Sequence, residues 1–248
     1  LLSEINKIDL DGLITLAHDP FLPAFEALIP GLVKAFDQWG SSVGEMNAAI
    51  EILRQWDFKT SEDSVAMTLA HFYGTRYGQK GVRPFAMSDM ELMTYFGSGS
   101  PEKERLAIFE ETLQQLNTDF GTWNTPWGSV NRYQRLNGDP RQAFNDSLPS
   151  TPIGFASGRW GALAAYGARY TNNTKKIYGT RGNSFVAVVS FGEKLQAKSI
   201  LAGGQSGDLN SPHFGDQLSR YAEANFKEVL FYKEAVLKDA QRSYYPGE

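Results

Sequence analysis

The spacing of the apolar residues changes once along the chain, close to Gly121. Before Gly121 these residues recur every three or four positions, as they do on one face of an α-helix. The clearest example comprises Phe21, Phe25, Leu28, Ile29, Leu32, Val33 and Phe36. After Gly121 they gather in short runs between loops rich in Gly, Pro, Asn and Ser, which favours strands. The pattern therefore predicts an α+β fold, with a mainly helical segment over residues 1–120 and a loop- and strand-rich segment over residues 121–248.

Prolines and hydroxyl side chains indicate where the helices of the first segment begin. Pro30 lacks a backbone N–H and is expected to kink or split the helix around it. Thr60 or Ser61 is predicted to cap the N-terminus of a later helix. Ser100 and Pro101 have the order of an N-cap and a first helical residue, so a further helix is predicted to start there. Residues 1–5 resemble the end of a helix that began earlier, which suggests that the chain starts within a larger polypeptide.

The strongest strand signal is a pair of runs, residues 184–191 and 194–201. Gly192 and Glu193 separate them and suit a tight type II′ turn, so the two runs are predicted to form a β-hairpin. The first run is almost entirely apolar, which is typical of a strand that is covered on both faces. We therefore expect this hairpin to lie deep inside a layered structure, with some of its neighbours supplied from elsewhere.

Three residue types of a serine hydrolase occur within residues 203–217, here called the closing segment. They are Ser211, His213 and Asp216. A catalytic serine needs a base within hydrogen-bonding reach and a third group that orients this base, and closeness in sequence does not supply that geometry. Ser211 is instead interpreted as the N-cap of a short helix, because Pro212 follows it. We therefore assign no catalytic residue, and a self-contained serine hydrolase built on Ser211 and His213 is a less favoured alternative.

Glycines open the closing segment, in the order Gly-Gly-Gln-Ser-Gly at residues 203–207. This order matches neither a phosphate-binding loop, which ends in Gly-Lys-Ser or Gly-Lys-Thr, nor the nucleophile elbow Gly-x-Ser-x-Gly. We interpret it as a crossing of two backbone segments at which side chains do not fit. No cofactor is predicted from it.

Metal-binding patterns are also missing from the sequence. The chain contains no cysteine and three histidines, His18, His71 and His213. No two of these histidines have the spacing of a zinc site, so each is interpreted as structural or surface-exposed. The carboxylates and the amide of the closing segment belong to Asp208, Asn210 and Asp216. They do not follow the pattern of a calcium-binding EF-hand loop, and no metal ion is predicted.

Charge and hydropathy argue against two further classes of function. The formal net charge is −4, with acidic and basic residues intermixed, so a nucleic-acid partner is not expected. No apolar run approaches the roughly 20 residues that span a bilayer, so membrane insertion is not expected either. Aromatic residues make up 13% of the chain and could line a groove between residues 123 and 178, although core packing is their more common use. A non-catalytic binding or scaffold module that uses this groove is the alternative to an enzyme.

An ordered series of motifs resembles the penicillin acylase family. The series runs through residues 127–132 (Trp-Gly-Ser-Val-Asn-Arg), the strands at 182–189 and 197–201, and the closing segment. Within the family the chain looks most similar to the aculeacin-type and acyl-homoserine-lactone acylases. The closing segment carries the most specific part of this resemblance, whereas the helical segment carries little of it.

The resemblance implies an N-terminal-nucleophile hydrolase with an αββα four-layer sandwich fold, to which the predicted hairpin would contribute. In that family a precursor cuts itself into a small and a large subunit. The new N-terminal serine of the large subunit attacks an amide carbonyl with its own α-amine as the base, and an asparagine and backbone N–H groups bind the oxyanion. In the family's order these groups precede the present chain, so none is carried over to Ser3 or Asn6. The resemblance thus implies the C-terminal part of the large subunit.

For function, the resemblance implies hydrolysis of N-acyl amides by the complete enzyme, such as acyl-homoserine lactones, β-lactam side chains or lipopeptides. It points to antibiotic metabolism or quorum quenching as the setting, and to a periplasmic or secreted location. The isolated chain is expected to be inactive because the nucleophile lies upstream. Its expected partners are the small subunit and the N-terminal part of the large subunit, and exposed sheet edges could also lead to self-association.

Overall fold

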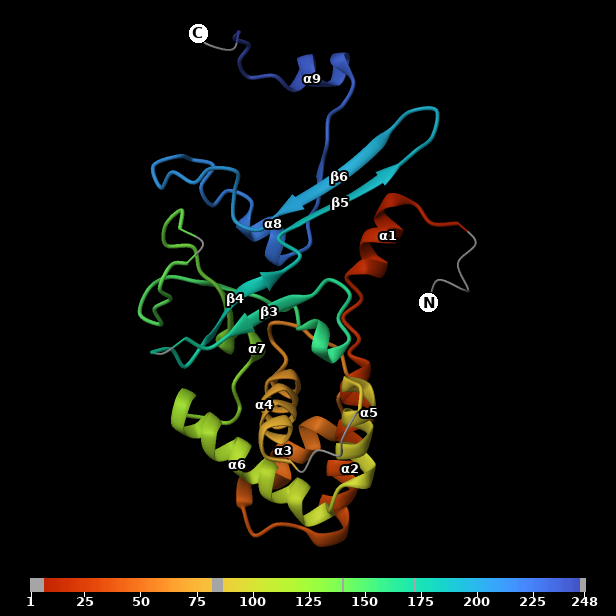
Figure 1. The fold of residues 1–248 in the computed structure, drawn as a ribbon, viewed down its shortest axis with the longest axis vertical. Coiled ribbons are helices and arrows are strands. Elements are labelled where there is room, and N and C mark those ends of the chain that lie inside the picture. Colours follow the sequence, from red (N-terminus) through yellow and green to blue (C-terminus); the bar gives the residue numbers. More distant parts are fainter. Residues whose placement is uncertain (1–6, 82–86, 140, 172, 246–248) are drawn as a thin grey trace.

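The computed structural model describes residues 7–81, 87–139, 141–171 and 173–245. The helical interpretation of residues 1–5 therefore lies outside the described residues. The fold is α+β, with helices followed by sheets, and this confirms the predicted fold class. In Figure 1 helices α2 to α6 gather at one end of the molecule, and the C-terminal helix α9 lies at the other end. The helices up to residue 120 are α1 Leu10–Ala17, α2 Pro23–Trp39, α3 Gly44–Arg54, α4 Val65–Lys80, α5 Asp89–Thr94, the π-helix η2 Tyr95–Gly99 and α6 Glu102–Phe120.

Helix α2 runs without interruption through Pro30, so the expected split of this helix is wrong. Pro30 is exposed, and the carbonyl group that loses its hydrogen bond, that of Glu26, belongs to another exposed residue that water can reach. The next residue, Gly31, packs directly against η2. A Cβ atom at Gly31 would lie 1.5 Å from the carbonyl oxygen of Gly97. This backbone-to-backbone contact holds α2 against the neighbouring helix on both sides of the proline.

The N-terminus of α4 is capped by Ser64 rather than by Thr60 or Ser61. The Ser64 hydroxyl accepts a hydrogen bond of 3.0 Å from the backbone N–H of Met67. Thr60 uses its hydroxyl differently, because it donates to the carbonyl oxygen of Gly154 at 2.5 Å. The side chain that sequence reasoning assigned to a helix cap therefore joins the helical segment to the strand-rich segment.

The predicted start of α6 is displaced by one residue. Pro101 occupies the N-cap position, and the Ser100 hydroxyl donates to the carbonyl oxygen of Phe96 at 2.8 Å. Ser100 is held there by Arg105, whose buried guanidinium donates to the Ser100 hydroxyl at 3.1 Å and to the carbonyl oxygen of Gly31 at 3.1 Å. Arg105 thus ties α6, η2 and α2 together, and this tertiary role overrides the local capping preference.

The described residues of the second segment form two sheets. The four-stranded sheet has the order β2-β1-β4-β3, with β1 and β4 parallel, and the three-stranded sheet has the order β5-β6-β7. The elements of this segment are α7 Trp127–Val130, β1 Asn131–Tyr133, β2 Thr151–Pro152, the 3-10 helix η3 Gly158–Trp160, β3 Tyr166–Arg169, β4 Ile177–Gly182, β5 Phe185–Ser190, β6 Gln196–Leu201, α8 Leu218–Ala222, β7 Lys227–Glu228 and α9 Lys233–Asp239. Strands β3 and β4 border the helical bundle, and β5 leads away from it (Figure 1).

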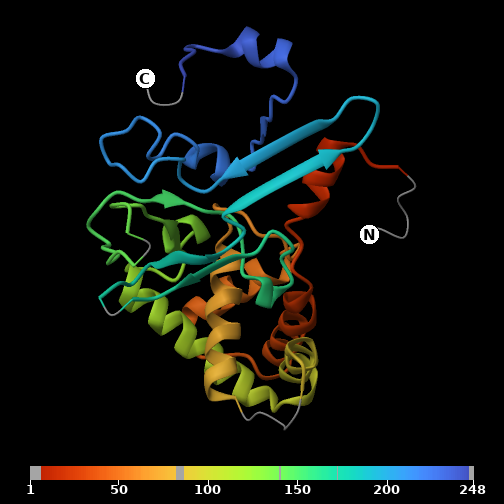
Figure 2. The same ribbon diagram turned by 45° about the horizontal axis from the view of Figure 1, so that its top comes forward.

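The hairpin exists, but its turn differs from the prediction. Ser190 pairs with Gln196, so residues 191–195 form the loop and the type II′ turn at Gly192 is wrong. The backbone N–H of Leu195 donates to the Tyr232 hydroxyl at 2.7 Å instead of joining the ladder. Figures 1 and 2 show the hairpin extending past α1. Strand β5 forms an edge of its sheet and Phe185 is 64% exposed, so the described chain does not cover this strand on both faces. The expected position deep inside a layered structure, with neighbours supplied from elsewhere, stays a prediction.

The closing segment contains turns where a helix from Ser211 was predicted, and α8 begins only at Leu218. The carbonyl groups needed for the helix are engaged elsewhere. That of His213 accepts from the backbone N–H of Ser206 at 3.1 Å, and that of Phe214 accepts from the Arg135 guanidinium. A Cβ atom at Gly204 would lie 2.2 Å from the His213 carbonyl oxygen, as expected for the backbone crossing inferred from the glycines.

Candidate functional site

The triad-like residues of the closing segment do not assemble a nucleophile. His213 Nδ1 lies 2.8 Å from Asp216 Oδ2, which is the contact between a base and its orienting carboxylate. The Ser211 hydroxyl, however, accepts from the backbone N–H of His213 at 3.2 Å, and no hydrogen bond between it and the His213 ring occurs in the described structure. The His213 and Asp216 side chains are 67% and 38% exposed. The three residues therefore form a solvent-facing turn, without the serine-to-base contact that catalysis requires.

The aromatic side chains proposed for a groove mostly belong to the core. Trp127 and Trp160 are buried, as are Tyr166 and Tyr178. The Trp127 indole donates to the carbonyl oxygen of Phe155 at 3.0 Å, and the Trp160 indole donates to His71 Nδ1 at 3.2 Å. These contacts join the helical bundle to the strand-rich segment. They leave little aromatic surface for the binding module that was the alternative to an enzyme.

His71 is held in the neutral state by this packing. Its ring lies 4.7 Å from the Trp127 ring, between centroids. Burial lowers the pKa of the imidazole to about 3, and the charge of Arg159 acts in the same direction. A neutral histidine that accepts a hydrogen bond at Nδ1 has a structural role here, in agreement with its interpretation from the sequence.

The motif at residues 127–132 also joins two parts of the chain. Asn131 Nδ2 donates to the carbonyl oxygens of Ile153 and Phe155, at 2.8 and 3.0 Å. The Arg132 guanidinium donates to the Ser150 hydroxyl at 2.9 Å and to the carbonyl oxygen of Gly128 at 2.7 Å. The donor groups of Asn131 and Arg132 are therefore bound to groups of the chain itself, which positions β1 beside β2.

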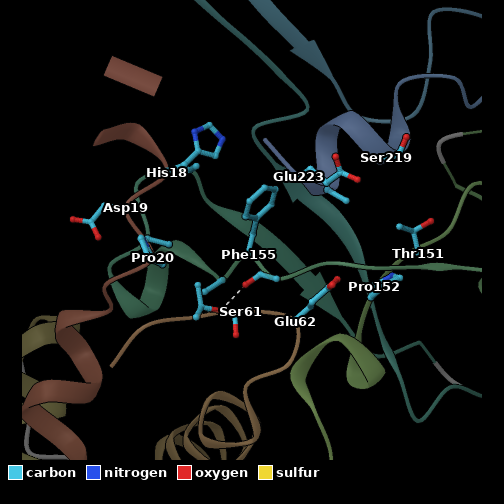
Figure 3. A pocket seen from close by; sticks show the side chains of 16 residues that line it. His18, Asp19, Pro20, Ser61, Glu62, Thr151, Pro152, Phe155, Ser219 and Glu223 are labelled. Carbon is cyan, nitrogen blue, oxygen red and sulfur yellow. Dashed lines mark hydrogen bonds between the residues drawn. The ribbon is translucent and has the colours of Figure 1, made fainter. Parts of the chain in front are cut away.

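A cavity of about 570 Å³ lies among five separate parts of the chain. Its walls come from the connection between α1 and α2, the loop before α4, residues 151–156, the segment after η3 at residues 162–164, and helix α8 with the residue that follows it. Figure 3 shows the Phe155 ring between His18 and Glu223, whereas the carboxylate of Asp19 points away from that ring. The residues labelled in this view are His18, Asp19, Pro20, Ser61, Glu62, Thr151, Pro152, Phe155, Ser219 and Glu223.

The chemistry of this cavity is acidic. Asp19, Glu62 and Glu223 contribute carboxylates, and within the described ranges none of them forms an ion pair. His18 Nδ1 lies 3.1 Å from the carbonyl oxygen of Ile14, so a proton on that nitrogen would leave Nε2 as an acceptor. Neither Ser61 nor Ser219 shares a hydrogen bond with His18 in the structure as described. The cavity can accept hydrogen bonds, but it presents no activated serine.

No group of three or more His, Cys, Asp or Glu residues among the described residues could hold a metal ion. Asp208, a candidate calcium ligand from the sequence, accepts a hydrogen bond at Oδ1 from the backbone N–H of Asn210 at 2.9 Å. The described part of the chain also contains no helix with the length and apolar character that a membrane crossing requires. The acidic cavity was missed by sequence reasoning, because its residues are scattered along the chain and form no local motif.

A family model for penicillin amidase matches residues 1–238. The chain belongs to the penicillin amidase family. This confirms the resemblance inferred from residues 127–132 and the closing segment, both of which lie within the match.

One solved structure similar to this chain is a thermostable penicillin G acylase from Alcaligenes faecalis. The sequence identity is 14% and the TM-score is 0.48, and the match covers 98% of the present chain and 50% of the acylase chain. The present chain therefore spans half the length of that acylase.

Proposed function

We propose that the protein containing this chain hydrolyses the amide bond of N-acyl compounds, and that this chain supplies a part of the large subunit that lies after the nucleophile. The observation that carries the proposal is the family match over residues 1–238. It is supported by the closing segment, in which Ser211 lacks a hydrogen bond to a base among the described residues. Residues 1–120 and 121–248 would form a helical and a sandwich-forming part of that subunit.

The proposed substrates are acyl-homoserine lactones, β-lactam side chains or lipopeptides, and the proposed location is periplasmic or secreted. Both rest on the resemblance of the closing segment to family members. The proposed partners are the small subunit and the N-terminal part of the large subunit. The exposed apolar face of β5 supports such partners, because Phe185 and Val189 are 64% and 40% exposed in this chain.

The test compares residues 1–248 with the full-length protein in an assay that follows amine release from an N-acyl-homoserine lactone and an N-acyl-p-nitroanilide. We expect hydrolysis by the full-length protein, none by residues 1–248, and no effect of Ser211→Ala on the full-length rate. Hydrolysis by residues 1–248 that is lost in Ser211→Ala would show that the serine hydrolase alternative is correct. If the full-length protein cleaves neither amide, the proposed activity is wrong.

A further inference from the structure

A second cavity has a volume of about 620 Å³ and shares no lining residue with the acidic cavity. Helix α8 borders both, because Tyr221 lines the second cavity whereas Ser219 and Ala222 line the acidic one. Its walls are formed by the loop after β1, the end of β4, Gly204 of the closing segment and Tyr221 of α8. The volume lies within the range of pockets that bind small organic molecules. Of its lining residues, Tyr166 is one of the aromatic residues that the sequence analysis considered for a groove.

Two tyrosine hydroxyl groups in this cavity have no hydrogen-bond partner among the described residues. Tyr221 is only 6% exposed, and it lines the cavity together with Tyr133. The neighbouring Tyr166 differs, because its hydroxyl donates to the carbonyl oxygen of Arg132 at 2.7 Å. Neither the Tyr133 nor the Tyr221 hydroxyl oxygen is fully enclosed by the described protein atoms, so both can be reached by a ligand in the cavity.

Both free hydroxyl groups are available as donors at neutral pH. Burial raises the pKa of Tyr221 to about 12, and the nearby Tyr133 acts in the same direction. Burial also raises the pKa of Tyr133. Phenol groups that stay protonated can donate to an anionic oxygen, so this part of the cavity favours an acceptor.

One charged side chain at this cavity, the Arg181 guanidinium, has no partner among the described residues. Arg181 of β4 lines the cavity, and its guanidinium forms no ion pair or hydrogen bond within the described structure. Arg135 also lines the cavity, but its guanidinium donates to the carbonyl oxygens of Gly204 and Ser206, at 3.1 and 2.7 Å. The one carboxylate of the described lining, that of Asp139, accepts from the backbone N–H of Arg141 at 2.7 Å. Arg181 is therefore the group that remains for an anion.

Aromatic rings also line this cavity and offer apolar surface to a ligand. Phe144 lines the cavity and stacks in parallel on Tyr178, with 4.9 Å between ring centroids. Tyr166 and Tyr221 lie side by side, with 6.5 Å between their centroids. A flat apolar group can pack against these surfaces, whereas a fully polar anion cannot use them.

We propose that this cavity binds a small aromatic carboxylate. The carboxylate pairs with Arg181 and accepts hydrogen bonds from the hydroxyl groups of Tyr133 and Tyr221, while the aromatic part packs near Phe144. The proposal goes beyond amide hydrolysis and does not rest on it, so each can fail while the other holds.

The first experiment measures binding of 3-phenylpropanoate to the full-length protein by isothermal titration calorimetry. The neutral 3-phenylpropan-1-ol and inorganic phosphate serve as comparison ligands. Because charge-assisted hydrogen bonds contribute more than neutral ones, we expect the alcohol to bind about tenfold more weakly or worse. Equal affinity for the acid and the alcohol, absence of acid binding, or phosphate binding as tight as that of the acid would each overturn the proposal.

Variants then assign the binding to this cavity. Arg181→Gln is expected to weaken 3-phenylpropanoate binding about tenfold or more. The matched control is Arg169→Gln on the adjacent strand β3, since Arg169 is exposed and does not line the cavity; it should leave the affinity unchanged. Equal effects of the two substitutions would place the carboxylate elsewhere and overturn the assignment.

A second pair of variants separates a ligand-binding hydroxyl from a structural one. Tyr221→Phe removes a hydroxyl that has no described partner, so it should weaken acid binding severalfold and leave the melting temperature unchanged. Tyr166→Phe removes the hydrogen bond to the Arg132 carbonyl group and should lower the melting temperature. A Tyr221→Phe variant with a lowered melting temperature and unchanged affinity would show that this hydroxyl serves the fold, and the proposal would be wrong.

Discussion

The helical segment and the three-stranded sheet bury their apolar side chains to very different degrees. In the helical segment, Phe25 of α2 and Phe109 of α6 are completely buried, and the core closes within the chain itself. In the sheet, β5 has a comparably apolar sequence, but only Val188 among its residues is buried. An apolar pattern therefore predicts a covered surface but does not show which part of a protein covers it.

The largest expected effect contrasts a phenylalanine from each region in residues 1–248. Phe109→Ala should lower the free energy of unfolding by about 3–5 kcal/mol, because it leaves a cavity in a closed core. Phe185→Ala should change it by less than about 0.5 kcal/mol, because that ring faces solvent. Urea unfolding measures both values. Similar losses for the two variants would mean that β5 is covered in residues 1–248.

The same two substitutions in the full-length protein test whether parts outside residues 1–248 cover β5. If the missing subunit parts cover β5, Phe185→Ala should become destabilising there, while the effect of Phe109→Ala stays the same. An unchanged Phe185→Ala effect would indicate that the outer face of β5 stays open in the complete enzyme. That result would remove one support for the proposed partners.

The next contrast concerns glycines. Gly31→Ala places a Cβ atom 1.5 Å from the Gly97 carbonyl oxygen, so α2 and η2 must separate and the free energy of unfolding should fall by about 3 kcal/mol. Gly207→Ala in the closing segment meets no atom within 4 Å and is expected to cost less than about 0.5 kcal/mol. Chemical denaturation of both variants decides the matter, and a Gly31→Ala variant as stable as the parent would contradict the close contact.

The sequence predicted the helical segment better than the strand-rich one, for a physical reason. The apolar stripe of α2 reports burial within one helix, and the structure contains that helix. Features that depend on distant partners were missed. Pro30 is tolerated because it faces solvent, Ser100 is held by Arg105, and the helix expected from Ser211 is replaced by turns whose carbonyl groups bind Ser206 and Arg135.

The site was less predictable than the fold. No triad was predicted from Ser211 and His213, and the described part of the structure shows no hydrogen bond between their side chains. The two cavities could not be predicted, since each is lined by residues from several distant segments. Arg181 and Tyr221 are unremarkable in the sequence. Their proposed role follows from the fold, which places both side chains at one cavity without a hydrogen-bond or ion-pair partner among the described residues.

A smaller effect is expected where the closing segment is anchored. Arg135 donates to the carbonyl oxygens of Gly204, Ser206 and Phe214, so Arg135→Gln should lower the free energy of unfolding by about 1–3 kcal/mol. Hydrogen exchange of residues 203–217 should become faster, while exchange in α6 should not change. The matched control is Arg141→Gln, whose side chain is exposed. Uniform acceleration in both regions would show that the two regions unfold together.

The smallest effect tests the contact between the two regions through pH. The native state keeps His71 neutral, with a pKa of about 3 instead of 6.5. Below pH 6.5 His71 therefore binds a proton in the unfolded chain but stays neutral in the native chain. The free energy of unfolding falls as the pH is lowered towards 3. The slope is at most about 1.4 kcal/mol per pH unit, so the expected loss between pH 6.5 and 5.5 is about 1 kcal/mol. His71→Gln should reduce this slope even if it lowers stability at every pH, because it removes the titrating group. His213→Gln, at an exposed turn, should leave the slope close to that of the parent, and equal slopes for all three proteins would exclude His71 as the source of the pH dependence.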